Sequence, residues 1–215
     1  SGWVAQSTSV AGVAQRTGAT VYYVELYPPV DQAARTGARG EPVLSLFPTP
    51  GQVDVVIASE LMEAGRAIQR GFTTPDRTTL IASTNRVYAV TEKIVLGDGR
   101  VDDASLLQSA ELSAKRLISA DFSALALKAG SVISSSLFGA LAGAGVLPFP
   151  RDAFEDALRR SGKGVERSLA AFALGYDAAL MTPEPTPVSA PTGLGPVRVT
   201  IGRRPPRDPE AEAAA

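Results

Sequence analysis

The 215-residue sequence contains no cysteine and no histidine. Without cysteine, the chain has no disulfide, no thiolate nucleophile and no thiolate ligand for an iron–sulfur cluster. Without histidine, it lacks the commonest general base and the commonest zinc ligand, so a Ser-His-Asp triad within this chain is excluded. Any chemistry would rest on carboxylates, lysine, tyrosine or backbone groups. We therefore expect no catalytic residue and no metal ligand in this chain.

Strong charge of either sign and long apolar runs are missing as well. The formal net charge is −1 and the pI is about 5.6, which excludes the basic surface typical of nucleic-acid-binding proteins. The sequence shows no membrane-spanning run and no secretory signal, so we expect a cytoplasmic protein without membrane contact. It begins at Ser1 without an initiator methionine, which indicates a processed product, a cloning remnant or a fragment of a longer protein.

Apolar and β-branched runs predict the strands. The expected strands cover residues 20–26, 53–58, 78–83, 87–90 and 93–96, with a weaker candidate at 122–126. The runs at 53–58 and 78–83 are typical of buried parallel strands, although Asp54 interrupts the first. Asp54 is then either a buried carboxylate that needs partners or a residue near the start of the strand.

Helical periodicity alternates with these runs. The expected helices cover residues 61–68, 103–118, 131–144, 152–160 and 165–180, and Gly162 ends the fourth. Within the third, Gly139 and Gly143 permit a close approach of another backbone. Strands that alternate with helices indicate an α/β fold, a three-layer αβα arrangement with a Rossmann-like sheet that is largely parallel or mixed.

The two ends of the sequence differ in composition. Residues 1–181 read as one folded domain with helices on both faces of the sheet. Residues 182–215 hold 8 of the 16 prolines, and we expect an extended or disordered tail there. Within the tail, residues 197–201 alternate as a short docking strand would.

Glycine-rich phosphate loops are not found. Gly139, Gly143 and Gly145 do not have the Gly-x-Gly-x-x-Gly spacing and lie inside a helical pattern. Residues 161–164, Ser-Gly-Lys-Gly, lack the upstream glycine and the final Ser or Thr of a P-loop. A phosphate site of either kind is therefore not predicted.

The segment from Ser7 to Thr20 is small, polar and followed by a strand. Gly12 and Gly18 permit close approach of a ligand or partner, and Gln15 and Arg16 are donors for phosphate or carboxylate. From spacing alone, an ordinary capped helix that leads into the strand is the simpler interpretation.

The same segment carries a family resemblance. Residues 12–18, Gly-Val-Ala-Gln-Arg-Thr-Gly, resemble the Gly-Met-Ala-Gln-Arg-Gly-Gly signature of gamma-type subunits of 2-oxoacid:ferredoxin oxidoreductases, with departures at Val13 and Thr17. Residues 4–7 resemble the strand that enters the signature. Further matches follow in the family's order, at 53–66, at Asn85 and at 162–176. The closest branch is the beta subunit of indolepyruvate ferredoxin oxidoreductase.

The resemblance implies a function that this chain performs only within an assembly. The parent enzyme oxidatively decarboxylates a 2-oxoacid, here an aryl pyruvate such as indolepyruvate, transfers the acyl group to coenzyme A and reduces ferredoxin. Thiamine diphosphate, Mg²⁺ and Fe–S clusters are expected on partner subunits or domains, and this chain is expected to bind none of them alone. The positions expected near substrate or coenzyme A are Gly12, Gln15, Arg16, Gly18, Glu60 and Asn85.

One departure and several alternatives remain open. Family members begin with a strand and a Gly-x-Gly-Gly-Gln-Gly turn, and this sequence has no such first βα unit. Glu60 is also interpretable as a helix cap or a solvated residue, and Asn85 as a turn residue. The main alternative function is a standalone α/β module that binds a nucleotide-like small ligand. A self-sufficient hydrolase or transferase is disfavoured by the absence of His and Cys.

Overall fold

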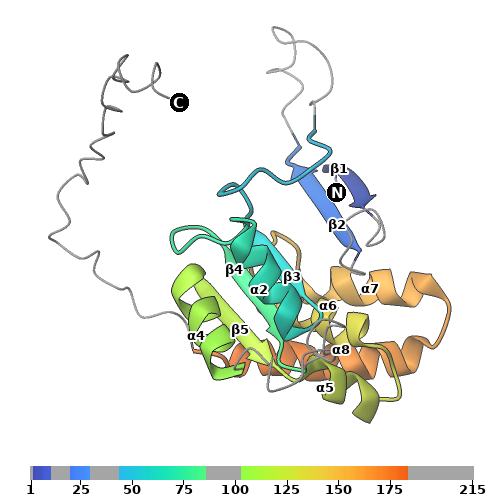
Figure 1. Cartoon of the computed structure of the whole chain (residues 1–215). Coiled ribbons are helices and arrows are strands. Elements are labelled where there is room, and N and C mark those ends of the chain that lie inside the picture. Colours follow the sequence, from blue (N-terminus) through green and yellow to red (C-terminus); the bar gives the residue numbers. More distant parts are fainter. Residues whose placement is uncertain (1, 11–19, 30–43, 86–102, 184–215) are drawn as a thin grey trace, which may run out of the picture. The chain divides into compact units, whose positions relative to one another are not determined.

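The computed structural model describes residues 2–10, 20–29, 44–85 and 103–183. Within them the chain forms a three-stranded parallel sheet with helices on both faces and a separate two-stranded antiparallel ribbon (Figure 1). The predicted α/β class is confirmed, and the antiparallel pair belongs to the ribbon rather than to a mixed sheet.

The parallel sheet consists of β3 (Val55–Ala58), β4 (Thr79–Ser83) and β5 (Arg116–Ala120), in the order β3-β4-β5. Every residue of the central strand β4 is buried. A continuous apolar run is expected in such a strand, because helices cover it from both sides. The predictions of strands at 53–58 and 78–83 are therefore confirmed, with shorter bounds.

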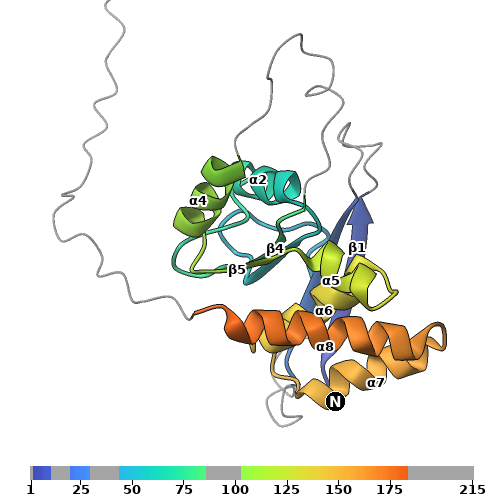
Figure 2. The same cartoon turned by 90° about the horizontal axis from the view of Figure 1, so that it is seen from below.

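Two groups of helices cover the two faces of this sheet (Figure 2). On one face, α2 (Leu61–Gln69) and α4 (Asp103–Ser113) pack against Leu80 and Ala82. On the other face, α5 (Phe122–Lys128), α6 (Ile133–Gly143) and α8 (Val165–Met181) enclose Ile81 and Ile118, both fully buried. Successive residues of a strand point to opposite faces, so β4 contributes side chains to both cores. Ile57 on β3 stays 43% exposed.

Helices α6 and α8 approach each other at backbone distance. A Cβ atom on Gly139 would lie 1.9 Å from the carbonyl oxygen of Phe172, and one on Gly143 would lie 2.6 Å from that of Tyr176. Carbon and oxygen atoms cannot approach so closely, so only glycine fits. The prediction that these two glycines permit close approach is confirmed.

Helix α7 (Arg151–Ser161) is fastened to α8 through Arg151. The Arg151 Nε donates to Glu155 at 2.7 Å, and its guanidinium lies 4.4 Å from the centre of the Tyr176 ring. Arg159 donates to the same carboxylate at 2.9 Å. The hydrogen bond from Arg151, followed by that from Arg159, lowers the pKa of Glu155 below its usual value. Gly162 ends α7 in the left-handed conformation, as predicted.

The ribbon pairs β1 (Val4–Val10) with β2 (Val21–Tyr27) in a register that runs from Val4 opposite Tyr27 to Val10 opposite Val21. One of its faces is crossed by the segment at Ser45 and Leu46. The Gln6 amide donates to the Ser45 carbonyl at 2.9 Å, and the Thr8 hydroxyl donates to the Leu46 carbonyl at 2.8 Å. Residues 4–10 are therefore a strand, and the capped helix considered for the segment from Ser7 is wrong for its first residues.

Two predictions between residues 103 and 128 are wrong. The helix predicted to reach Ile118 ends at Ser113, and Arg116–Ala120 forms β5. The weak strand predicted from Phe122 is helix α5. The pattern around Leu117 and Ile118 is compatible with a helical stripe and with a buried strand. These residues form a strand because they pair with the edge of β4. The Asp121 carboxylate accepts from the Ala124 N–H at 2.8 Å and so starts α5.

Some predictions fall outside the described residues. These are the strands at 87–90 and 93–96 and the tail from residue 184 onward. Within the described part, no single helix is long and apolar enough to cross a membrane. Helices α5 and α6 pass that test only as a pair, which is bent by 114°.

Candidate functional site

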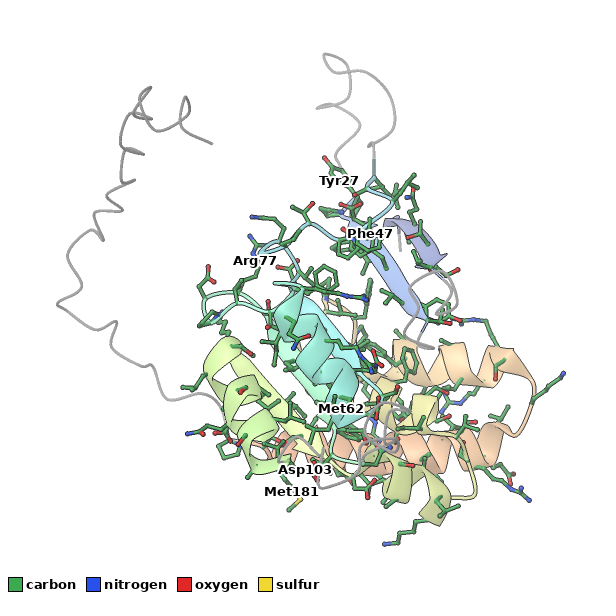
Figure 3. The ribbon with its side chains drawn as sticks, viewed as in Figure 1. Tyr27, Phe47, Met62, Arg77, Asp103 and Met181 are labelled. Atoms are coloured by element: carbon green, nitrogen blue, oxygen red, sulfur yellow. The ribbon has the colours of Figure 1, made fainter. Side chains whose placement is uncertain are left out.

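The carboxyl ends of the three parallel strands form the candidate site, since ligands of open α/β sheets bind beyond these ends. Ser59 and Glu60 follow β3, Thr84 and Asn85 follow β4, and Asp121 follows β5. The opposite, amino end of the sheet carries Arg77. Figure 3 shows Arg77 far from Met62, which lies in the first turn of α2 next to the carboxyl ends.

The structure brings Glu60 and Asn85 to the same edge. The backbone N–H of Leu61, the residue after Glu60, donates to the Asn85 carbonyl at 3.1 Å. Glu60 occupies the N-cap position of α2 in an extended conformation, and its side chain makes no capping hydrogen bond. The carboxylate is therefore not used to start the helix, contrary to the capping interpretation of this residue.

The side chain of Asn85 is the least satisfied polar group at this edge. Its Oδ1 is buried and has no hydrogen-bond donor among the described residues. A buried acceptor that stays unpaired costs roughly 1–3 kcal/mol, so such an atom normally has a partner in the working protein. The Asn85 amide oxygen is thus the clearest position at which a ligand or partner N–H or O–H would gain a bond.

Two serines fix the start of α5 beside this edge. The Ser83 Oγ accepts from the Phe122 N–H at 3.0 Å, and the Ser136 hydroxyl lies 2.7 Å from the Phe122 carbonyl. Both serines and Phe122 are fully buried. Next to them, the Thr84 N–H donates to the Ala120 carbonyl at 2.9 Å. These contacts were not predicted, because residues 122–126 were expected to form a strand.

Four of the expected site residues cannot be placed by the structure. Gly12, Gln15, Arg16 and Gly18 lie outside the described residues. They belong to the connection between β1 and β2, whose facing ends are Val10 and Val21. The signature segment therefore joins the two strands of the ribbon, whereas Glu60 and Asn85 belong to the parallel sheet.

Asp54 is a residue near the start of the strand and not a buried carboxylate. It precedes β3 at the amino end of the sheet, its side chain is 77% exposed, and it accepts from Arg77 at 2.8 Å. At the same end, the fully buried Thr78 hydroxyl donates to the Val53 carbonyl at 2.8 Å and accepts from the Thr74 N–H at 3.0 Å. These contacts hold the turn before β4 and lie away from the carboxyl edge.

The described residues do not fit a resident metal or cluster. They contain no group of three Asp, Glu, His or Cys side chains that would hold a metal ion. The whole sequence lacks the cysteine that an iron–sulfur cluster needs. What the edge provides instead is a carboxylate, an unpaired amide oxygen and backbone groups, which can bind and orient a ligand.

The sequence matches the model of a known protein family. A family model described as pyruvate ferredoxin/flavodoxin oxidoreductase matches residues 1–178. No protein with a curated description matches the chain. The match covers the ribbon, the parallel sheet, the segment between β1 and β2 and the helices except the last three residues of α8.

Proposed function

Because this match spans most of its length, the chain belongs to the pyruvate ferredoxin/flavodoxin oxidoreductase family, and we propose that it serves there as the gamma-type subunit or domain without a cofactor of its own. In this role the chain associates with other oxidoreductase subunits or domains, which bear thiamine diphosphate, Mg²⁺ and iron–sulfur clusters. The oxoacid is an aryl pyruvate such as indolepyruvate, the acyl acceptor is coenzyme A and the electron acceptor is ferredoxin.

The main support for this proposal is the family match, and the absence of cysteine and histidine agrees with it. Thiamine diphosphate supplies the carbanion chemistry of such enzymes, and clusters carry the electrons. This chain has neither cysteine nor histidine. Its contribution is to bind and orient: Arg16 makes an anion contact, and Glu60 and Asn85 line the approach of substrate or coenzyme A. Gly12, Gln15 and Gly18 belong to the same contact segment as Arg16.

The contact role of Arg16 is tested in the assembled complex. We expect Arg16→Ala to raise the apparent KM for coenzyme A or oxoacid about tenfold, the effect of losing roughly 1.4 kcal/mol of binding. Arg77→Ala is the matched control, because Arg77 pairs with Asp54 at the opposite end of the sheet. Equal kinetic constants for the Arg16 variant and the wild type would show that Arg16 does not contact substrate or coenzyme A.

The choice of oxoacid is tested separately. The wild-type complex is assayed for coenzyme A-dependent ferredoxin reduction with indolepyruvate, phenylpyruvate and pyruvate. The proposal expects kcat/KM to be at least tenfold higher for the aryl substrates. A preference for pyruvate would reject the indolepyruvate assignment and leave membership of the family untouched.

The exposed surface favours this function over a standalone ligand-binding module. Such a module is expected to be a monomer with its apolar side chains covered, whereas Tyr22 and Val24 of the ribbon are 73% and 57% exposed. Size-exclusion chromatography of the isolated chain separates the two functions. A stable monomer that binds a nucleotide-like ligand unaided would support the module.

A further inference from the structure

The two faces of the β1–β2 ribbon have different surroundings. We call one of them the open face, formed by Ala5, Ser7, Ser9, Tyr22, Val24 and Leu26, which share a side because alternate residues of a strand point the same way. All of these residues except the half-buried Leu26 are exposed. Small side chains on β1 stand opposite the large apolar side chains on β2, with Ser9 facing Tyr22 and Ser7 facing Val24.

The opposite face of the ribbon is occupied. Gln6 and Thr8 donate to the segment at Ser45 and Leu46, and Glu25 accepts from the Ser45 N–H. Burial and the neighbouring Glu25 carboxylate raise the pKa of Tyr23 above its usual value, and Tyr23 shares this face. The ribbon is therefore fastened on this face, and Trp3, just before β1, adds a ring contact to Phe149 at a centroid distance of 5.6 Å. Among the described residues, nothing comparable covers the open face.

Charge sets the open face apart from the rest of the surface. The chain as a whole is 20% charged, yet the open face has no charged side chain. The only charged residue in either strand is Glu25, which lies on the occupied face. Exposed strands are usually protected by lysine, proline or other charge, and the open face carries none of these. An uncharged partner surface with an apolar centre complements such a face.

We propose that the open face is a docking surface for the thiamine-bearing oxidoreductase subunit or domain, with Tyr22 and Val24 as the side chains that it buries. This inference rests on the proposed function, which requires such a partner. The ribbon runs directly into residues 11–19, so a partner that reaches Arg16 also meets the strands on either side. Tyrosine is enriched at the centres of protein interfaces, where a few aromatic and arginine side chains supply most of the binding energy.

The proposed function favours this partner over a second copy of the chain, because the family match implies association with other oxidoreductase subunits or domains. An interface of standard size takes roughly 800 Å² from each side. In a twofold contact the large side chains of one β2 would have to pack on the small side chains of the other β1. A second copy is therefore the competing outcome of the test.

The test uses the full chain and its coexpressed thiamine-bearing subunit. Tyr22→Thr combined with Val24→Thr keeps strand-forming side chains at two exposed positions and removes the apolar area. We expect the dissociation constant, measured by biolayer interferometry, to rise at least tenfold, with an unchanged circular dichroism spectrum. Leu112→Gln combined with Leu127→Gln is the matched control, because these leucines are 72% and 78% exposed on α4 and α5. The control is expected to bind as the wild type does.

Each other outcome overturns a different statement. If the ribbon variant binds the subunit as tightly as the wild type does, the docking surface is wrong and the proposed function stands. If the wild type itself fails to bind that subunit, the proposed function and the docking surface both fail. If the isolated wild type is a dimer that the ribbon variant makes monomeric, with subunit binding unchanged, the face belongs to a second copy.

Discussion

Gly139 on α6 and Gly175 on α8 each face the backbone of the other helix. A Cβ on Gly139 would lie 1.9 Å from the Phe172 carbonyl oxygen, and one on Gly175 would lie 1.8 Å from the Ser136 carbonyl oxygen. The contact is reciprocal, because Phe172 precedes Gly175 by three residues and Ser136 precedes Gly139 by three. The two helices thus touch backbone to backbone without an intervening side chain.

Alanine at either position is expected to destabilise the protein strongly. The better helix propensity of alanine contributes about 1 kcal/mol, whereas the clash requires the helices to separate and disrupts the packing of the buried Phe172. We expect Gly139→Ala and Gly175→Ala each to lower the free energy of unfolding by about 3 kcal/mol, measured by urea denaturation.

Gly65→Ala in α2 is the control for this prediction. Its new Cβ would lie 3.2 Å from Leu106 Cδ2, the end of a side chain that can turn away. Helix propensity then dominates, and we expect unchanged or slightly raised stability. A similar loss in all three variants would show that the close approach of α6 and α8 is not the cause.

Glu155 is expected to make stability depend on acid pH. Its folded pKa is lowered, chiefly by the hydrogen bond from Arg151. Its contribution is therefore complete above the unfolded pKa, about 4.3, and is lost as the pH falls through the folded value. We expect Glu155→Gln to unfold at lower urea concentration than the wild type at pH 7, with a difference that shrinks below pH 4. Carbon-detected NMR titration of the Glu155 carboxyl measures the pKa directly, and an ordinary value would contradict the prediction.

Thr78 is expected to stabilise the turn before β4 through its hydroxyl. Thr78→Val keeps the shape of the side chain and leaves the Val53 carbonyl and the Thr74 N–H without this partner. We expect a loss of about 2 kcal/mol in thermal or urea unfolding. Thr78→Ser retains the hydroxyl and is expected to recover most of that loss. Equal stability of the valine and serine variants would assign the effect to packing instead.

Replacement of Asn85 by alanine is expected to weaken ligand binding without lowering the stability of the fold. Asn85→Ala removes a buried acceptor that has no donor among the described residues, so the free energy of unfolding should stay the same or rise by about 1 kcal/mol. In the assembled complex the same variant is expected to raise the apparent KM for oxoacid or coenzyme A several-fold. A marked loss of stability with normal kinetics would make Asn85 a structural residue.

The parallel sheet was predictable where local pattern and burial agree. The runs that form β3 and β4 are apolar on both faces, and Gly162 stops α7 as a left-handed glycine does. The pattern failed at Leu117 and Ile118, which suit a helix by spacing and a strand by composition. Only pairing with β4, a contact between distant segments, decides between the two.

The candidate site also has a part that the sequence predicts and a part that depends on contacts between distant segments. Glu60 and Asn85 follow predicted strands, so their presence at one edge could be anticipated from strand order. The bonds of Ser83 and Ser136 to Phe122 join residues 39 and 14 positions apart, and no local pattern encodes them. Asp121 was the one missed local signal, since an aspartate followed by Ala, Leu and Lys at helical spacing is typical of a short capped helix.

The order of synthesis determines when α8 can cover its face of the parallel sheet. All three strands of the parallel sheet are complete at Ala120, whereas α8 extends to Met181. Until the ribosome has released about sixty more residues, Ile81 and Ile118 lack α8, the last of the three helices that cover them in the finished protein. Folding of this face is therefore completed only after α8 has been synthesised, and a nascent chain stalled after β5 offers chaperones an uncovered apolar sheet face.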